Sequence, residues 1–140
     1  MAGTGVTVWH NPACGTSRNV LGLIRNAGIE PEIVEYLRSP PDRATLEAAI
    51  ARMGIPVRGL VRQKEALYGE LGLDGADDVA LLEAMLAHPV LINRPVVFTA
   101  TAARLCRPSE QVLDILPSPQ GAFAMEDGEA VVDARGRRLR

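Results

Sequence analysis

The stretch VTVWHNPACGTSRNVLGLIRNAGIEPEIVEY, residues 6–36, decides the fold of this 140-residue chain. Its first four residues are β-branched or aromatic and predict a strand at 6–9. Apolar residues then recur at intervals of three and four, which predicts one face of a helix: Val20, Leu23, Ile24 and Ala27. A second strand is predicted at 32–36. A strand, a helix and a strand within about 30 residues indicate a βαβ unit with parallel strands.

Residues 42–93 are predicted to form a helical insertion after this unit. Asp42 suits the N-cap of a first helix, because its side chain can accept a hydrogen bond from a free backbone N–H. A later helix is expected from about 77 to 87, with Val79, Leu82 and Leu86 buried. The residues between these helices are expected to form short helical turns.

The last part of the chain is predicted to return to strands. Segments 94–100 and 103–106 are separated by a short turn, which favours a hairpin. A final helix is expected with Pro108 at its first position. Residues from about 117 to 140 are rich in proline, glycine and charge and predict a surface tail, in which a short extended piece can form. Its basic end, RGRRLR, is expected to be solvated. The order β-α-β, helical insertion, β-β-α predicts one α/β domain, residues 1–140, with a thioredoxin-like fold.

Composition limits the classes of function. The net charge is −2 and only 4% of residues are aromatic, which argues against a nucleic-acid partner. The first residues lack the basic and apolar regions of a signal peptide, and no apolar run approaches the roughly 18 residues of a membrane span. We therefore expect a cytoplasmic protein whose two cysteines are free thiols. Nothing in the sequence demands more than a monomer.

Cys14 lies where the first strand gives way to the first helix. The N–H groups and partial positive charge of a helix N-terminus stabilise a thiolate, which is the reactive form of cysteine. His10 and Arg18 bracket Cys14 and are positioned to add positive field. The alternative is a buried structural cysteine, but the flanking prolyl, glycyl and hydroxyl residues are not typical of a core.

Two spacings around Cys14 narrow its chemistry. The motif is CGTS and not C-x-x-C, so Ser17 stands where a dithiol oxidoreductase keeps its second cysteine. A resolving thiol must then come from Cys106 or from another molecule. Residue 20 is valine, so the C-x5-R phosphate loop of tyrosine phosphatases is also absent.

Arginines supply the remaining clue, since guanidinium groups that converge on a thiolate would make a site for a tetrahedral oxyanion. Arg58, Arg62, Arg94 and Arg107 are the candidates, although any one of them alone is more often a surface charge. Arg94 directly precedes Pro95, and a proline at the start of this strand is cis and faces the active cysteine in thioredoxin-like folds.

Three segments resemble the glutaredoxin-dependent arsenate reductases of bacteria: HNPACGTSRN (10–19), HPVLINRPVV (88–97) and RLCRPSEQVLDIL (104–116). The resemblance implies the thioredoxin-like fold with a helical insert. It implies that Cys14 attacks the arsenic of arsenate, that His10 lowers the pKa of this thiol and that Ser17 lies near the thiolate. Arg62, Arg94 and Arg107 would hold the oxyanion, whereas Arg58 is not assigned to the site.

The same resemblance implies an arsenic-detoxifying cycle in which glutathione is the co-substrate and glutaredoxin the protein partner. The thiols of glutathione and glutaredoxin would replace the resolving cysteine that the motif lacks. No metal and no bound organic cofactor are needed. Cys106 has a counterpart in the family and is interpreted as structural, with a resolving role as the less favoured alternative.

Two other functions remain open on the sequence. One is a regulator of the same fold that binds RNA polymerase, and the other is a glutathione-dependent thiol reductase acting on a different substrate. The first is usually marked by a C-x-x-C switch or by loss of the oxyanion arginines, and the second does not need three arginines. Ser17 and the three retained arginines therefore favour the arsenate reductase.

Overall fold

The computed structural model describes residues 5–117 and 120–140. The chain forms two compact units. One comprises the residues up to Val34 together with Arg94–Arg140, and the other comprises Glu35–Asn93. Within the described residues, no helix combines the length and apolar character that crossing a membrane requires.

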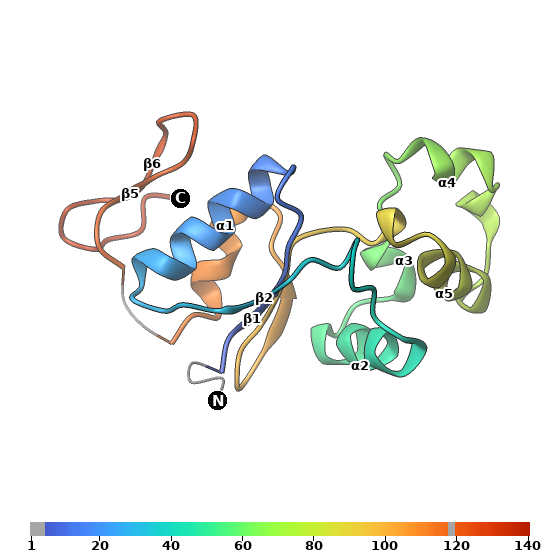
Figure 1. The fold of residues 1–140 in the computed structure, drawn as a ribbon. Coiled ribbons are helices and arrows are strands. Elements are labelled where there is room, and N and C mark those ends of the chain that lie inside the picture. The colour runs from blue at the N-terminus through green and yellow to red at the C-terminus, as the bar shows by residue number, and fades with distance from the viewer. Residues whose placement is uncertain (1–4, 118–119) are drawn as a thin grey trace. The chain divides into compact units, whose positions relative to one another are not determined.

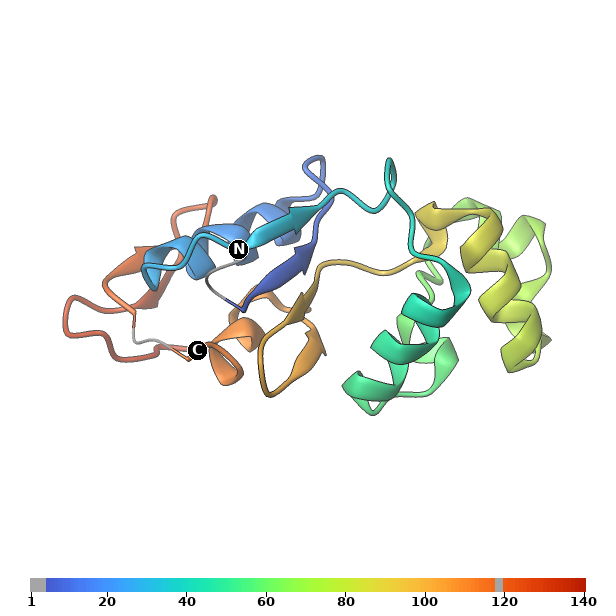
Figure 2. The same ribbon diagram turned by 60° about the horizontal axis from the view of Figure 1, so that its bottom comes forward.

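The first unit is built on a four-stranded sheet of order β2-β1-β3-β4. Its strands are β1 (Thr7–Trp9), β2 (Glu32–Val34), β3 (Val96–Phe98) and β4 (Ala103–Leu105). β1 and β2 are parallel, whereas β3 is antiparallel to both β1 and β4. Figure 2 shows the two blue arrows of β1 and β2 beside the orange hairpin of β3 and β4. The predicted βαβ unit, the hairpin and the α/β fold class are confirmed.

Helix α1 (Gly15–Asn26) packs against the short 3-10 helix η3 (Ser109–Asp114), next to which it lies in Figure 1. The predicted inner face of α1 is confirmed, because Val20, Leu23 and Ile24 are fully buried in one core with residues of β1 and β3. Gly28 follows the C-cap with φ +83°, a left-handed conformation that favours glycine and ends the helix.

The end of the β3–β4 hairpin differs from the prediction in detail. The expected last helix is a 3-10 helix, and Pro108 is its extended N-cap residue and not its first helical residue. The helix spans six residues, and Val112 on it is fully buried in the core that holds α1. The peptide bonds Arg94–Pro95 and Arg107–Pro108 are both cis, which confirms the prediction for Pro95.

The described C-terminal residues are mostly exposed and contain short extended pieces, as predicted, but they also contribute to the core, which was not predicted. Strands β5 (Phe123–Ala124) and β6 (Ala130–Val132) pair as an antiparallel hairpin. Met125, Val131 and Val132 are buried in the same core as α1. The basic end, residues 135–140, is exposed as predicted, and two of its arginines form ion pairs, Arg138 with Asp114 and Arg140 with Glu110 and Glu129. A two-valine strand among charged residues is too short to give a periodic signal, which explains why the sequence did not predict these buried residues.

The second unit is helical. It contains α2 (Arg43–Met53), α3 (Val57–Leu60), α4 (Ala66–Glu70), η1 (Leu73–Gly75), α5 (Asp78–Ala87) and η2 (Pro89–Leu91). The predicted cap is confirmed, because the N–H of Thr45 donates to Asp42 Oδ1 at 2.8 Å. The predicted face of α5 is wrong in part: Val79 is 58% exposed, and the buried residues are Leu81, Leu82 and Met85. The run LLEAML is apolar on more than one face, so its spacing does not fix which side packs inward.

Candidate active site

Cys14 is the N-cap residue of α1, at the end of the loop that follows β1. Its N–H donates to the carbonyl oxygen of Asn11 at 3.0 Å, and its own carbonyl accepts from the N–H of Arg18 at 3.0 Å. The N–H of Ala13 donates to Asn11 Oδ1 at 3.0 Å. These bonds close a tight turn that leaves the Cys14 side chain at the first turn of the helix.

The surroundings of Cys14 favour its thiolate. Burial raises the pKa of this thiol, but opposing effects outweigh it, so that the pKa lies below its ordinary value. The largest of them is a hydrogen bond from the backbone N–H of Ser17, followed by the positive charge of Arg94. A hydrogen bond from Arg107 and one from the N–H of Thr16 add to the effect. The pKa of Cys14 is therefore lowered both by the helix start, as predicted, and by Arg94 and Arg107.

Sheet register explains why Arg94 and Arg107 meet Cys14. Arg94 lies two residues before β3 and Arg107 two residues after β4, so in an antiparallel hairpin they share one end of the sheet. β3 is also antiparallel to β1, with Val96 opposite Trp9, and this end is therefore the one from which the Cys14 loop leaves. Arg107 Nη1 lies 3.9 Å from Cys14 Sγ and donates to the carbonyl oxygen of Arg94 at 3.1 Å. Arg94 is only 8% exposed, whereas Arg107 is open to solvent.

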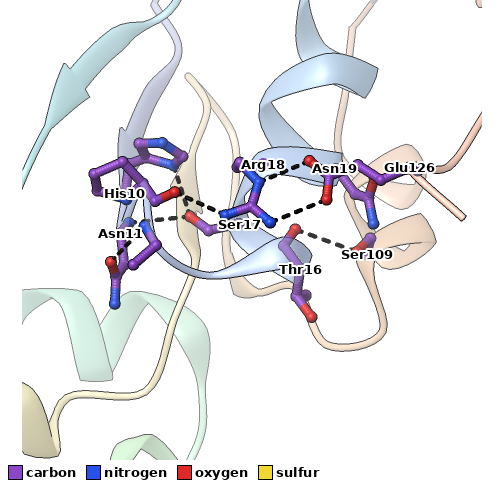
Figure 3. Close-up of polar contacts among 10 residues, drawn as sticks. His10, Asn11, Thr16, Ser17, Arg18, Asn19, Ser109 and Glu126 are labelled. Carbon is purple, nitrogen blue, oxygen red and sulfur yellow. Dashed lines mark hydrogen bonds and ion pairs between the residues drawn. The ribbon is translucent and has the colours of Figure 1, made fainter.

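His10 and Ser17 form a buried polar pair beside the loop, as Figure 3 shows. His10 Nδ1 and Ser17 Oγ are 2.6 Å apart, and the N–H of Asn11 donates to the same hydroxyl oxygen at 3.1 Å. The Ser17 hydroxyl thus ties the residues before the loop to the first turn of α1. Since the backbone N–H of Ser17 stabilises the thiolate, this link connects His10 to Cys14 through the helix.

Arg18 interacts electrostatically with Cys14, as predicted, but its main partner was not predicted. Glu126 raises the pKa of Arg18 most, and the negative charge of the Cys14 thiolate adds to the effect. The guanidinium pairs with Glu126, Nε to Oε2 at 2.7 Å and Nη2 to Oε1 at 3.1 Å. Its Nη1 donates to the carbonyl oxygen of Pro12 at 2.8 Å. Glu126 could not be found from the sequence, because nothing in its local sequence signals a partner 108 residues away.

Arg62 belongs to the helical unit. Its backbone N–H donates to the carbonyl oxygen of Leu91 at 2.7 Å, and its Nε lies 3.7 Å from Glu65 Oε2. Its role at Cys14 stays a prediction. The side chain of Arg58 is taken up by three acceptors in the same unit: Tyr68 Oη and the carbonyl oxygens of Leu73 and Ala76. This structural role agrees with leaving Arg58 out of the site.

Cys106 is fully buried in the core of the first unit, and burial raises its pKa to about 12. Both cysteines are free thiols. In the described part of the chain, His, Cys, Asp and Glu side chains nowhere gather in a group of three that could hold a metal ion. The arrangement suits nucleophilic attack by one thiolate on an anion held by arginines.

Comparisons with known proteins agree with this chemistry. The ArsC family matches residues 9–115. The chain is 60% identical over 137 residues to an arsenate reductase of Rhizobium meliloti, covering 96% of this chain and 98% of that protein. It is 56% identical over 140 residues to an arsenate reductase of Escherichia coli K12, covering 98% and 99%. Among solved structures, an arsenate reductase from Vibrio cholerae aligns with a TM-score of 0.77 and 43% identity over 81% of this chain and 98% of that one.

Proposed function

We propose that this chain, which belongs to the ArsC family and is an arsenate reductase, takes its reducing electrons from glutathione and glutaredoxin. The observation that carries the proposal is the single activated thiol. Cys14 has a lowered pKa and a guanidinium nitrogen of Arg107 3.9 Å from its sulfur, and Ser17 stands where a local resolving thiol would be.

In the first proposed step the Cys14 thiolate attacks the arsenic of arsenate. A bond forms between sulfur and arsenic, and one arsenate oxygen leaves as water after protonation, without a change in the oxidation state of arsenic. Arg94 and Arg107 are placed to bind the oxyanion, since their charges offset the repulsion between an anionic substrate and an anionic nucleophile. Arg62 is proposed as the third arginine.

In the second step the thiol of glutathione displaces another oxygen of the adduct as water, which places two sulfurs on arsenic(V). The thiolate of glutaredoxin then attacks the glutathione sulfur. A disulfide forms between glutaredoxin and glutathione, and the electron pair of the sulfur–arsenic bond stays on arsenic, which becomes arsenic(III). Water releases arsenite and returns Cys14 as a thiol. Overall, two thiols lose two electrons and arsenate loses one oxygen as water.

The proposed cycle explains why one cysteine is enough. Cys106, buried and with a pKa raised to about 12, is unsuited to supply the resolving thiolate at neutral pH. Glutathione and glutaredoxin belong to the reducing cytoplasm, which we propose as the location. The cycle uses one cysteine of this chain and needs no second copy of it, so we propose a monomer.

The test is arsenate turnover coupled to glutathione and glutaredoxin, with arsenite measured directly. The wild type should turn over, and leaving out either thiol component should stop it. Cys14→Ser should be inactive, and Arg94→Ala should bind arsenate more weakly. Arsenite formation by Cys14→Ser would overturn the nucleophile, whereas full turnover without glutaredoxin would overturn the electron route only. If the wild type reduced a glutathione mixed disulfide but not arsenate, the result would support the alternative function, a glutathione-dependent thiol reductase.

A further inference from the structure

The C-terminal segment runs along α1 toward the Cys14 loop. At the far end of the helix, Asn26 Nδ2 donates to the carbonyl oxygen of Gly121 at 3.0 Å. In the middle, Phe123 packs so closely that a Cβ on Gly22 would lie 2.9 Å from its ring. At the near end, Glu126 meets Arg18. Residues 121–126 thus contact α1 from its last turn to its first.

Glu126 reaches the active loop through Arg18, as the dashed lines of Figure 3 show. Arg18 holds the carboxylate with two nitrogens and the carbonyl oxygen of Pro12 with the third. The backbone of Glu126 is fixed too, because its N–H donates to Asn19 Oδ1 at 3.0 Å. A Cβ on Gly15, the residue after Cys14, would lie 3.6 Å from Arg18 Nη2 and 3.7 Å from Glu126 Oε1.

We infer that Glu126 and Arg18 are positioning residues for the Cys14 loop, so that the C-terminal hairpin takes part in the reaction without touching the substrate. All five N–H donors of a guanidinium lie in one plane. A carboxylate that fixes the plane by two bonds therefore also fixes the direction in which the third nitrogen points. That direction sets the place of the Pro12 carbonyl, two residues before the nucleophile.

The pair is exposed, 44% for Arg18 and 47% for Glu126, and exposed ion pairs contribute little to stability. Arg25 of the same helix forms a comparable exposed pair with Glu30, which follows the helix, through two bonds of 2.9 Å. Arg25 lies in the last turn of α1, away from Cys14. A purely stabilising role would make the two pairs equivalent, whereas a positioning role makes only the first matter for the thiol.

The test measures the rate of Cys14 alkylation by iodoacetamide against pH, with peptide mapping to separate it from Cys106. This readout needs no arsenate, so it can fail or succeed apart from the proposed function on which the inference rests. The variants are Arg18→Lys and Glu126→Gln, with Arg25→Lys and Glu30→Gln as controls. Thermal unfolding of each variant identifies any loss of folded protein.

Arg18→Lys keeps the charges of residues 18 and 126. It loses the two-bond contact with Glu126 and the hydrogen bond to the carbonyl oxygen of Pro12. We expect its alkylation midpoint to rise by about half a pH unit, and kcat/KM for arsenate to fall about threefold to tenfold, because the sulfur moves relative to its donors. The controls should leave both quantities unchanged. An unchanged midpoint in Arg18→Lys, or an equal shift in Arg25→Lys, would overturn the inference.

Glu126→Gln separates position from charge by the sign of its effect. Removal of a nearby negative charge would by itself favour the thiolate and lower the midpoint. Loss of positioning takes the sulfur away from the N–H groups of the first helical turn and raises it. We expect the midpoint to rise; a fall would show that Glu126 acts as a charge alone and would contradict a positioning role.

Discussion

Cys14 and Cys106 are two buried thiols of one compact unit, 7% and 0% exposed, and they have opposite chemistry. The sulfur of Cys14 accepts hydrogen bonds from backbone N–H groups and from a guanidinium, which lowers its pKa. The sulfur of Cys106 lies at the end of β4 and donates its proton to the carbonyl oxygen of Arg104 at 3.6 Å.

Charges near Cys106 do not reverse the effect of its burial. Arg104 lowers the pKa of Cys106 and Asp114 raises it, and these two residues form an ion pair of 3.1 Å with each other. Arg94 and Arg107, by contrast, both act on Cys14 in the same direction. The comparison teaches that burial alone does not decide the reactivity of a thiol. The direction of the nearest hydrogen bonds and the pairing of the nearest charges decide it.

The sharpest test of this comparison is the rate at which the two thiols react. Cys14 has a pKa below 9.0 and Cys106 one of about 12, a difference of more than three units. At neutral pH the thiolate fractions then differ at least about a thousandfold, and we expect iodoacetate to label Cys14 faster by this order or more. Peptide mapping after short exposure measures both rates in one sample. Rates within tenfold of each other would break the comparison.

The raised pKa of Cys106 should make the stability of the protein depend on pH in the alkaline range. A raised pKa in the folded state contributes stability that is complete below the ordinary thiol pKa near 9 and is lost as pH rises toward about 12. Three units correspond to about 4 kcal/mol of unfolding free energy. We expect the wild type to lose about this much more stability between pH 9 and 12 than Cys106→Ala does, as measured by urea unfolding. Parallel curves for the two proteins would contradict a buried, protonated Cys106.

The sequence predicted one side of this comparison better than the other. The reactivity of Cys14 follows from its local sequence. A cysteine between a strand and an amphipathic helix lies at the helix N-terminus, whatever the rest of the chain packs against. The cis Arg94–Pro95 bond and the nearness of Arg107 followed from a proline position, a hairpin and a family resemblance. Glu126 could not be predicted, since its pairing depends on a hairpin whose strands are two and three residues long.

Removing a guanidinium next to Cys14 should lower the activity toward arsenate more than removing one elsewhere. We expect Arg107→Gln to lower kcat/KM for arsenate by about tenfold to a hundredfold, because it removes a donor that meets both the thiolate and the proposed oxyanion. The pKa of Cys14 should rise in the same variant. Arg43→Gln, which removes an exposed guanidinium paired with Glu83 in the helical unit, is the control and should keep the wild-type value. Equal losses in the two variants would mean that Arg107 acts through general charge or stability.

The smallest effect on the thiol is expected from Ser17→Ala, although the substitution lies three residues from Cys14. It removes a hydroxyl that contacts His10 at 2.6 Å and the N–H of Asn11 at 3.1 Å, so we expect a loss of about 1–3 kcal/mol of unfolding free energy. The backbone N–H of Ser17, which is the largest single influence lowering the pKa of Cys14, remains in alanine. The alkylation midpoint should therefore move by less than about half a pH unit while stability falls. A rise of a full unit or more would show that the side chain, and with it His10, holds the thiolate, and the account of Cys14 would then rest on the buried polar pair more than on the helix start.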